Sequence, residues 1–272
     1  MEMTSIQNPW HNEAHNSAQA QAQPPVLLLR GLLRESRHWL NFPNELANTL
    51  QRPVLSLDLP GCGALHQQRS ASTVPALRAQ LQAQWQLRYP EYQQKNVDVV
   101  AISMGGMLAL DWAFAAPSQI KSLTLINSSS AGLSPLWQRF KPQNYLNVLQ
   151  ALVTTSHQRE QLIWQMTVNS PINPQILAKW QQWAKECPVT RANALRQLWA
   201  ASRFRISAIP SCPIQILSSV QDPLVSSACS QALADKLQAP IFSHATAGHD
   251  LPLEDSEWLV SKISEFLSSI DG

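Results

Sequence analysis

Residues 97–106 read Val97-Asp98-Val99-Val100-Ala101-Ile102-Ser103-Met104-Gly105-Gly106, an apolar run followed by small residues. The apolar part, Val97 to Ile102, is typical of a parallel β-strand that is covered on both faces. The segment that follows, Met104 to Ala115, has the Ala and Leu content and the length of a helix that crosses over to the next strand. Ser103 is therefore predicted to lie at a strand-to-helix turn.

The same alternation of strand and helix extends over most of the chain. Other short apolar runs predict strands at Val26 to Arg30, Val54 to Leu57, Ser122 to Ile126, Pro213 to Leu217 and Ala239 to Phe242. Further segments of helix length lie at Asn44 to Leu50, Val74 to Tyr89 and Glu257 to Ile270. This alternation predicts an α/β fold, a mostly parallel sheet of about six or more strands with helices on both faces.

The chain is predicted to divide into an arm, a core and a cap. Residues 1–24 are rich in Gln, Ala, Asn and His, lack periodic apolar positions, and are expected to form a flexible arm. Residues 25–127 and 207–272 carry the predicted strands and form the α/β core. Residues 128–206 interrupt the alternation with helix-like segments that contain several tryptophans, so a helical cap or lid is expected there.

The composition argues against several classes of function. The 20 basic and 18 acidic residues leave a formal net charge of +2 without any basic run, so no nucleic acid partner is expected. The cysteines Cys62, Cys187, Cys212 and Cys229 lack zinc-site spacing and are expected to be free thiols, with no metal or cofactor. No segment approaches the roughly 18 consecutive apolar residues of a membrane span, and the first residues do not resemble a signal peptide. A cytoplasmic protein without stable membrane insertion is expected, and its oligomeric state is left open.

Ser103 is the strongest candidate for a catalytic residue. A sharp turn between strand and helix exposes a nucleophile's hydroxyl, and small neighbours let the two elements approach closely. The sequence around Ser103 resembles the nucleophile elbow of the α/β-hydrolase superfamily, usually written G-x-S-x-G, with Ala101 in place of the first glycine. The alternative is a serine in an ordinary glycine-rich turn, but the strand before it and the helix after it favour the nucleophile.

The resemblance covers Pro25 to Ile270 and implies that an acid and then a histidine follow the nucleophile along the chain. Asp222 lies in the loop after a late predicted strand, at a position similar to that of the family's acid. The other position that the family uses carries Asn127, which offers no carboxylate. A turn-forming Asp before Pro is the alternative reading of Asp222, and Asp250 is the next candidate for the acid.

His249 is the expected general base, because it follows the last predicted strand as the family's catalytic histidine does. His244 continues the strand pattern, where a side chain would point into the packing of the sheet, and is therefore disfavoured. An imidazole is needed because a serine hydroxyl is a poor nucleophile at neutral pH until a base takes its proton. A carboxylate then orients the imidazole and stabilises the imidazolium.

The resemblance also implies an oxyanion hole. The backbone N–H groups of Leu32, in the loop after the first strand, and of Met104 would hold the oxyanion together. Gly31 fits the family's usual His-Gly-x sequence in this loop, but Arg30 replaces the His. Because that His is generally a structural support, the replacement affects the expected loop geometry more than the chemistry.

Together these features predict a serine hydrolase that cleaves carboxylic esters of short to medium acyl chains through an acyl-enzyme intermediate, with a small-molecule ester as its partner. Hydrolysis of amide, thioester or C–C bonds, perhydrolysis, and a non-catalytic binding protein of this fold are the alternatives. Tryptophans of the cap are expected to line an apolar substrate cleft, with packing of the cap onto the core as the alternative. These tryptophans are Trp137, Trp164, Trp180, Trp183 and Trp199.

Overall fold

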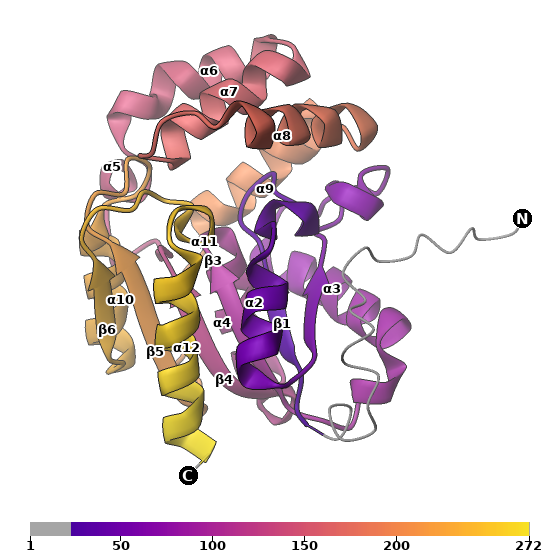
Figure 1. Ribbon diagram of the computed structural model, residues 1–272, viewed down its shortest axis with the longest axis vertical. Coiled ribbons are helices and arrows are strands. Elements are labelled where there is room, and N and C mark those ends of the chain that lie inside the picture. Colours follow the sequence, from indigo (N-terminus) through magenta and orange to yellow (C-terminus); the bar gives the residue numbers. More distant parts are fainter. Residues whose placement is uncertain (1–22, 272) are drawn as a thin grey trace, which may run out of the picture.

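The centre of the molecule is a six-stranded parallel sheet in the order β2-β1-β3-β4-β5-β6 (Figure 1). The computed structural model describes residues 23–271, apart from the side chain of Leu152; residues 1–22, most of the predicted arm, lie outside the described residues. The strands are β1 (Val26–Leu29), β2 (Val54–Leu57), β3 (Val97–Ile102), β4 (Ile120–Ile126), β5 (Ile214–Ser219) and β6 (Ile241–His244). This sheet confirms the predicted α/β fold, and the ends of the strands differ from the predicted ends by one or two residues at most.

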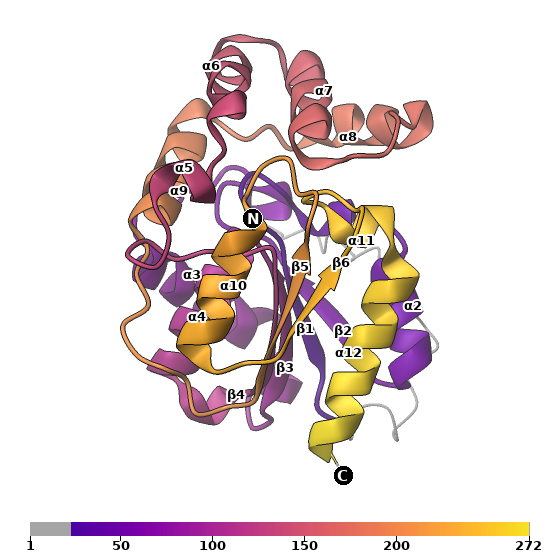
Figure 2. The ribbon, with the colours of Figure 1, turned by 90° about the vertical axis from the view of Figure 1, so that its left-hand side faces the viewer.

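Helices cover both faces of the sheet, as Figure 2 shows from the side. α2 (Phe42–Leu50) and α12 (Ser256–Asp271) lie on one face, and α3 (Val74–Arg88), α4 (Met104–Ala115) and α10 (Ser227–Leu237) lie on the other. Successive side chains of a strand point to opposite faces, so Leu27 belongs to the core under α3 and α4 while Leu28 belongs to the core under α2 and α12. Both faces are buried, which explains why the strands read as continuous apolar runs.

One charged residue interrupts the apolar run of β3 and is fully paired. Asp98 is buried, forms an ion pair with Arg52, and accepts a hydrogen bond from Ser122 Oγ at 2.5 Å. The register between β3 and β4 shifts beside it, between Val97 and Asp98. A buried carboxylate with these partners is compatible with a central strand.

Five helices follow β4 and precede β5. They are α5 (Leu136–Arg139), α6 (Tyr145–Val153), α7 (Ser156–Thr167), α8 (Pro174–Glu186) and α9 (Arg191–Arg203). Short helical turns complete the description: η2 (Ser36–Trp39), η3 (Gly63–Leu65), η4 (Pro90–Tyr92), η5 (Pro117–Gln119), η6 (Pro142–Asn144) and α11 (Leu251–Glu254). In Figures 1 and 2, α6, α7 and α8 lie beyond the carboxyl ends of the strands. In open α/β sheets ligands bind at this edge, so the loops that follow the strands here are the place to look for a site.

Candidate active site

Ser103 occupies a sharp turn between β3 and α4. Its backbone has φ 57° and ψ −120°, a conformation that is costly for a residue with a side chain. Its N–H donates to the carbonyl oxygen of Ile126 at 2.8 Å, which ties the turn to the end of β4. The Ser103 side chain lines a cavity at this edge of the sheet. The local geometry is therefore that of a strained strand-to-helix turn whose serine lines a cavity.

Two glycines let neighbouring elements approach this turn. A Cβ atom on Gly105 would lie 2.4 Å from the carbonyl oxygen of Leu29, so α4 can begin against the end of β1 only because glycine is present. A Cβ atom on Gly31 would lie 3.0 Å from Ser103 Cβ and 3.5 Å from Ser103 Oγ. The loop after β1 therefore passes directly beside the Ser103 hydroxyl.

The structure brings Asp222 and His249 together. His249 Nδ1 lies 2.6 Å from Asp222 Oδ2, and both side chains are buried. The second carboxylate oxygen, Oδ1, accepts hydrogen bonds from the N–H groups of Leu224 at 2.7 Å and Val225 at 2.9 Å. With the carboxylate held in this way, a neutral His249 carries its proton on Nδ1, which leaves Nε2 as the hydrogen-bond acceptor.

The alternatives considered for the acid and the base have other partners. Asp250 forms a bidentate ion pair with Arg30, with distances of 3.0 and 2.6 Å between nitrogen and oxygen atoms. His244 Nε2 lies 3.0 Å from Asp255 Oδ2, and its Nδ1 accepts a hydrogen bond from the N–H of Ala247 at 3.0 Å. Asp222, and not Asp250, is thus the carboxylate in hydrogen-bond contact with the His249 ring.

Asn127, at the position where the family can carry an acid, supports the loops around the site. Its Oδ1 accepts from the N–H of Ser219 at 2.8 Å, and its Nδ2 donates to the carbonyl oxygen of His249 at 3.0 Å. The side chain therefore joins the end of β5 to the loop that carries His249. An amide can donate and accept at once, which a carboxylate at this position could not do.

Leu32 and Met104, the residues expected to form an oxyanion hole, follow in the chain Gly31, which lies beside Ser103, and Ser103 itself. Met104 is the first residue of α4, and the first N–H groups of a helix have no partner within it. The hydrogen bonds found among residues 23–271 include none donated by the backbone N–H of either residue. Both N–H groups therefore lack a partner within the described chain; Leu32 lines the cavity, whereas Met104 is buried and is not among the lining residues.

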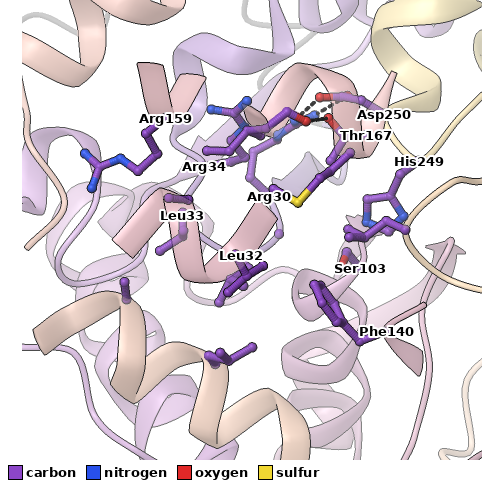
Figure 3. Close-up of a pocket in the computed structure, with 18 of the residues that line it drawn as sticks. Arg30, Leu32, Leu33, Arg34, Ser103, Phe140, Arg159, Thr167, His249 and Asp250 are labelled. Atoms are coloured by element: carbon purple, nitrogen blue, oxygen red, sulfur yellow. Dashed lines mark hydrogen bonds and ion pairs between the residues drawn. The ribbon is translucent and has the colours of Figure 1, made fainter. Parts of the chain in front are cut away.

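The cavity above Ser103 lies between the loops of the core and the helices that follow β4 (Figure 3). It encloses about 1040 Å³ of empty space, its open mouth included. Its lining is mostly apolar, with Leu32 and Leu33 on the loop after β1, Ile163 and Met166 on α7, and Phe140 after α5. An apolar pocket with a few polar groups is typical of small-molecule sites.

The expectation that cap tryptophans line the cleft is corrected by the structure, because none of the five lines this cavity within the described chain. Trp137 and Trp199 are exposed, at 63% and 56%. Trp164 and Trp180 are buried against each other, with ring centroids 5.1 Å apart, and pack behind Ile163. The remaining one, Trp183, contacts the His38 ring. Trp164 and Trp180 therefore hold α7 and α8 together, and smaller side chains of α7 face the cavity.

Several cavity residues were not identified from the sequence. The ion pair between Arg30 and Asp250 joins the loop after β1 to the loop that carries His249. In the sequence, only the replacement of the family's usual His by Arg30 indicated that this loop is unusual. Arg34 Nη1 lies 2.6 Å from Glu160 Oε2, which ties the same loop to α7. No local pattern could have predicted that pair, because the two residues lie far apart in the chain.

Other types of site receive no support from the described residues. Within residues 23–271, no group of three or more His, Cys, Asp and Glu side chains could hold a metal ion. No helix in this part of the chain is long and apolar enough to span a bilayer. The four cysteines are free thiols, as predicted, and burial raises the pKa of Cys62 to about 12. A buried thiol with so high a pKa is not a nucleophile at neutral pH.

Comparisons with known proteins agree with this architecture. The model of the alpha/beta hydrolase family matches residues 26–262. Comparison with curated protein sequences gives no significant match. A thermophilic esterase from Thermogutta terrifontis superposes with a TM-score of 0.72 at 19% identity, covering 91% of this chain and 90% of that chain.

Two further solved structures show the same fold. An enol-lactonase from Burkholderia xenovorans has a TM-score of 0.73 at 16% identity, with 90% of this chain and 91% of that chain covered. A bacterial membrane phospholipase A has a TM-score of 0.74 at 19% identity, with 92% and 80% covered. At these identities the likeness concerns the fold alone.

Proposed function

Because the chain belongs to the alpha/beta hydrolase family, we propose that it hydrolyses carboxylic esters, with Ser103 as nucleophile, His249 as general base and Asp222 as supporting acid. The observation that carries this proposal is the 2.6 Å contact between His249 Nδ1 and Asp222 Oδ2, with His249 and Ser103 lining one apolar cavity. Pairing with Asp222 directs the basic Nε2 of His249 away from the carboxylate, which is the arrangement that a serine nucleophile requires.

In the proposed reaction, His249 Nε2 takes the proton of Ser103 Oγ as that oxygen attacks the ester carbonyl carbon. The tetrahedral intermediate collapses when the protonated His249 gives this proton to the leaving alcohol, and the acyl group stays on Ser103. A water molecule, deprotonated by His249, then attacks the acyl-enzyme and releases the acid. Asp222 stays ionised throughout and stabilises the imidazolium in both steps.

The N–H groups of Leu32 and Met104 are proposed to bind the oxyanion of both tetrahedral intermediates. Their lack of a partner in the described chain and the close approach of Gly31 to Ser103 support this role. Loss of one such donor typically costs roughly a hundredfold to a thousandfold in rate. The donors are preorganised, because one belongs to the start of a helix and the other to a loop held by the pairing of Arg30 with Asp250.

Residues 128–206 are proposed to act as a lid that sets substrate preference, since α6, α7 and α9 contribute apolar residues to the cavity. Each methylene buried in such a cavity gains roughly 0.8 kcal/mol. Short to medium acyl chains should therefore be hydrolysed with higher kcat/KM than acetate, until the chain fills the cavity.

A panel of p-nitrophenyl esters of increasing acyl length tests the proposal. We expect kcat/KM to rise and then fall with length for the parent protein, and turnover to be lost in Ser103→Ala. Ile163→Ala should move the optimum to longer chains, because Ile163 lines the cavity. Trp137→Ala, on the exposed surface, is the matched control and should leave the profile unchanged. Equal turnover by the parent and Ser103→Ala would contradict the proposal.

A further inference from the structure

Four arginines line the cavity above Ser103, and two of them are neutralised by carboxylates. Arg30 is paired with Asp250 at 2.6 Å, and both side chains are 4% exposed. Arg34 is paired with Glu160 at 2.6 Å, where both side chains are 7% exposed. These two pairs are buried and serve to connect elements, so neither arginine is available to a ligand as a net charge.

The other two, Arg159 on α7 and Arg191 on α9, have no carboxylate partner among residues 23–271. The guanidinium of Arg159 makes one long hydrogen bond, from Nη1 to the carbonyl oxygen of Val189 at 3.4 Å. Val189 lies just before Arg191 in the chain, so the two arginines belong to segments that are in contact. The cavity thus carries two uncompensated positive charges from neighbouring segments.

Arg191 is exposed to solvent, and it lies at the end of its helix that is unfavourable for a cation. Arg191 is the first residue of α9, where the helix dipole is positive, and the first turn contains no acidic residue. A cation at this end is unfavourable for the helix. An anion bound here would interact favourably with both guanidinium groups and with the helix dipole.

The charges lie apart from the reacting groups. Figure 3 shows Arg159 on the opposite side of the cavity from Ser103 and His249, with its guanidinium group directed away from them. Apolar residues of α7 and α9, including Ile163 and Leu195, line the same cavity. A ligand that reached from Ser103 to Arg159 would pass along an apolar wall and end beside a positive charge.

We propose, on the basis of the ester hydrolase function above, that the substrate is an ester whose apolar chain ends in an anionic group, a carboxylate or a phosphate, bound by Arg159 and Arg191. Planar guanidinium groups suit carboxylate and phosphate oxygens because they can donate two parallel hydrogen bonds. The apolar wall binds the chain, and the two arginines select its anionic end. This combination distinguishes the substrate from a simple neutral ester.

Paired esters that differ only in the terminal charge test the proposal. One set carries the charge on the acyl chain: mono-p-nitrophenyl esters from succinate to sebacate, each against the neutral ester of equal chain length. A second set carries it on the alcohol: butyl to decyl hexanoates against their ω-carboxylate forms. We expect one set to show a preference of about tenfold in kcat/KM for the charged ester, as for a charge-assisted hydrogen bond.

Variants assign the preference to these arginines. Arg159→Gln and Arg191→Gln should each reduce the ratio of charged to neutral kcat/KM, and the double variant should abolish the preference. Arg196→Gln, on the same helix but outside the cavity lining, is the matched control and should retain the parent ratio. Added salt should lower the ratio in the parent and not in the double variant, because the charges near the cavity mouth are screened.

A binding measurement separates failure of this proposal from failure of the ester hydrolase function. Calorimetric titration of Ser103→Ala with adipic acid monoamide and with hexanamide reports charge preference without any turnover. If neither ester set is hydrolysed, the ester hydrolase proposal fails, while tighter binding of the monoamide would still support the anionic subsite. Equal or weaker binding of the monoamide, or a charge preference that survives in the double variant, would overturn it.

Discussion

The ion pair between Arg30 and Asp250 provides a quantitative test of how the site is built. Asp250→Asn keeps the shape of the side chain but removes the charge that faces the Arg30 guanidinium. Arg30 is 4% exposed, and its Nε already lacks a hydrogen-bond partner in the described chain. The variant therefore leaves the Arg30 charge buried without a counter-charge, and this unpaired buried charge lowers the stability of the folded state.

The expected loss of stability is about 3 kcal/mol, at the lower end of the range for broken buried pairs because water can reach Arg30 through the cavity. At roughly 2.1 cal/mol/K of unfolding entropy per residue, a chain of 272 residues would then lose about 5 °C in Tm. Arg30→Met combined with Asp250→Asn should recover much of this loss, because no unpaired charge remains. The coupling energy from the double-mutant cycle isolates the pair.

Differential scanning calorimetry of the parent, the two single variants and the double variant measures these values. kcat for the best p-nitrophenyl ester, measured in parallel, should fall in both single variants because the pair joins the loop of Leu32 to the loop of His249. If Asp250→Asn unfolds at the parent Tm, or if the effects of the two single changes on stability are additive, Arg30 and Asp250 are not energetically coupled.

Three further perturbations follow from the geometry. Asp222→Asn should lower kcat about 10⁴-fold with a much smaller change in KM, because the carboxylate stabilises the imidazolium formed during the reaction; unchanged kcat in steady-state kinetics would place the acid elsewhere. Gly31→Ala puts a methyl group 3.0 Å from Ser103 Cβ, so kcat should fall at least about tenfold with little change in Tm, whereas wild-type kcat would show that the loop can move away. Burial, and then the Arg34 charge, lowers the pKa of His38 well below 6.5. The unfolded state therefore binds a proton that the folded state does not, and stability should decrease by about 1.4 kcal/mol per pH unit as the pH falls below 6.5. Urea unfolding of the parent and His38→Gln should show a weaker pH dependence in the variant, and equal slopes would refute the assignment.

The α/β sheet could be predicted because its signals are local. Each strand is an apolar run that is buried on both faces, and the segment from Val97 to Ala115 contains a strand, a turn and a helix in sequence. Ser103, Asp222 and His249 could be nominated because each follows a predicted strand, and parallel strands end at one edge of the sheet.

The parts that could not be predicted depend on contacts between distant segments. The tryptophans of residues 128–206 are large and apolar, which suits a cleft or a helix interface equally well. Only the packing of α7 on α8 places Trp164 and Trp180 in an interface. Arg159 likewise has no local pattern that marks it as a cavity residue. Its position follows from the contact of α7 with the segment before α9.

Covalent labelling shows directly whether Ser103 is the nucleophile. The folded protein is incubated with a fluorophosphonate at neutral pH, digested, and mapped by mass spectrometry. We expect one adduct per chain, on the peptide that contains Ser103, with no labelling of Ser103→Ala and strongly slowed labelling of His249→Ala. An adduct on another residue, or labelling of Ser103→Ala at the parent rate, would contradict this expectation.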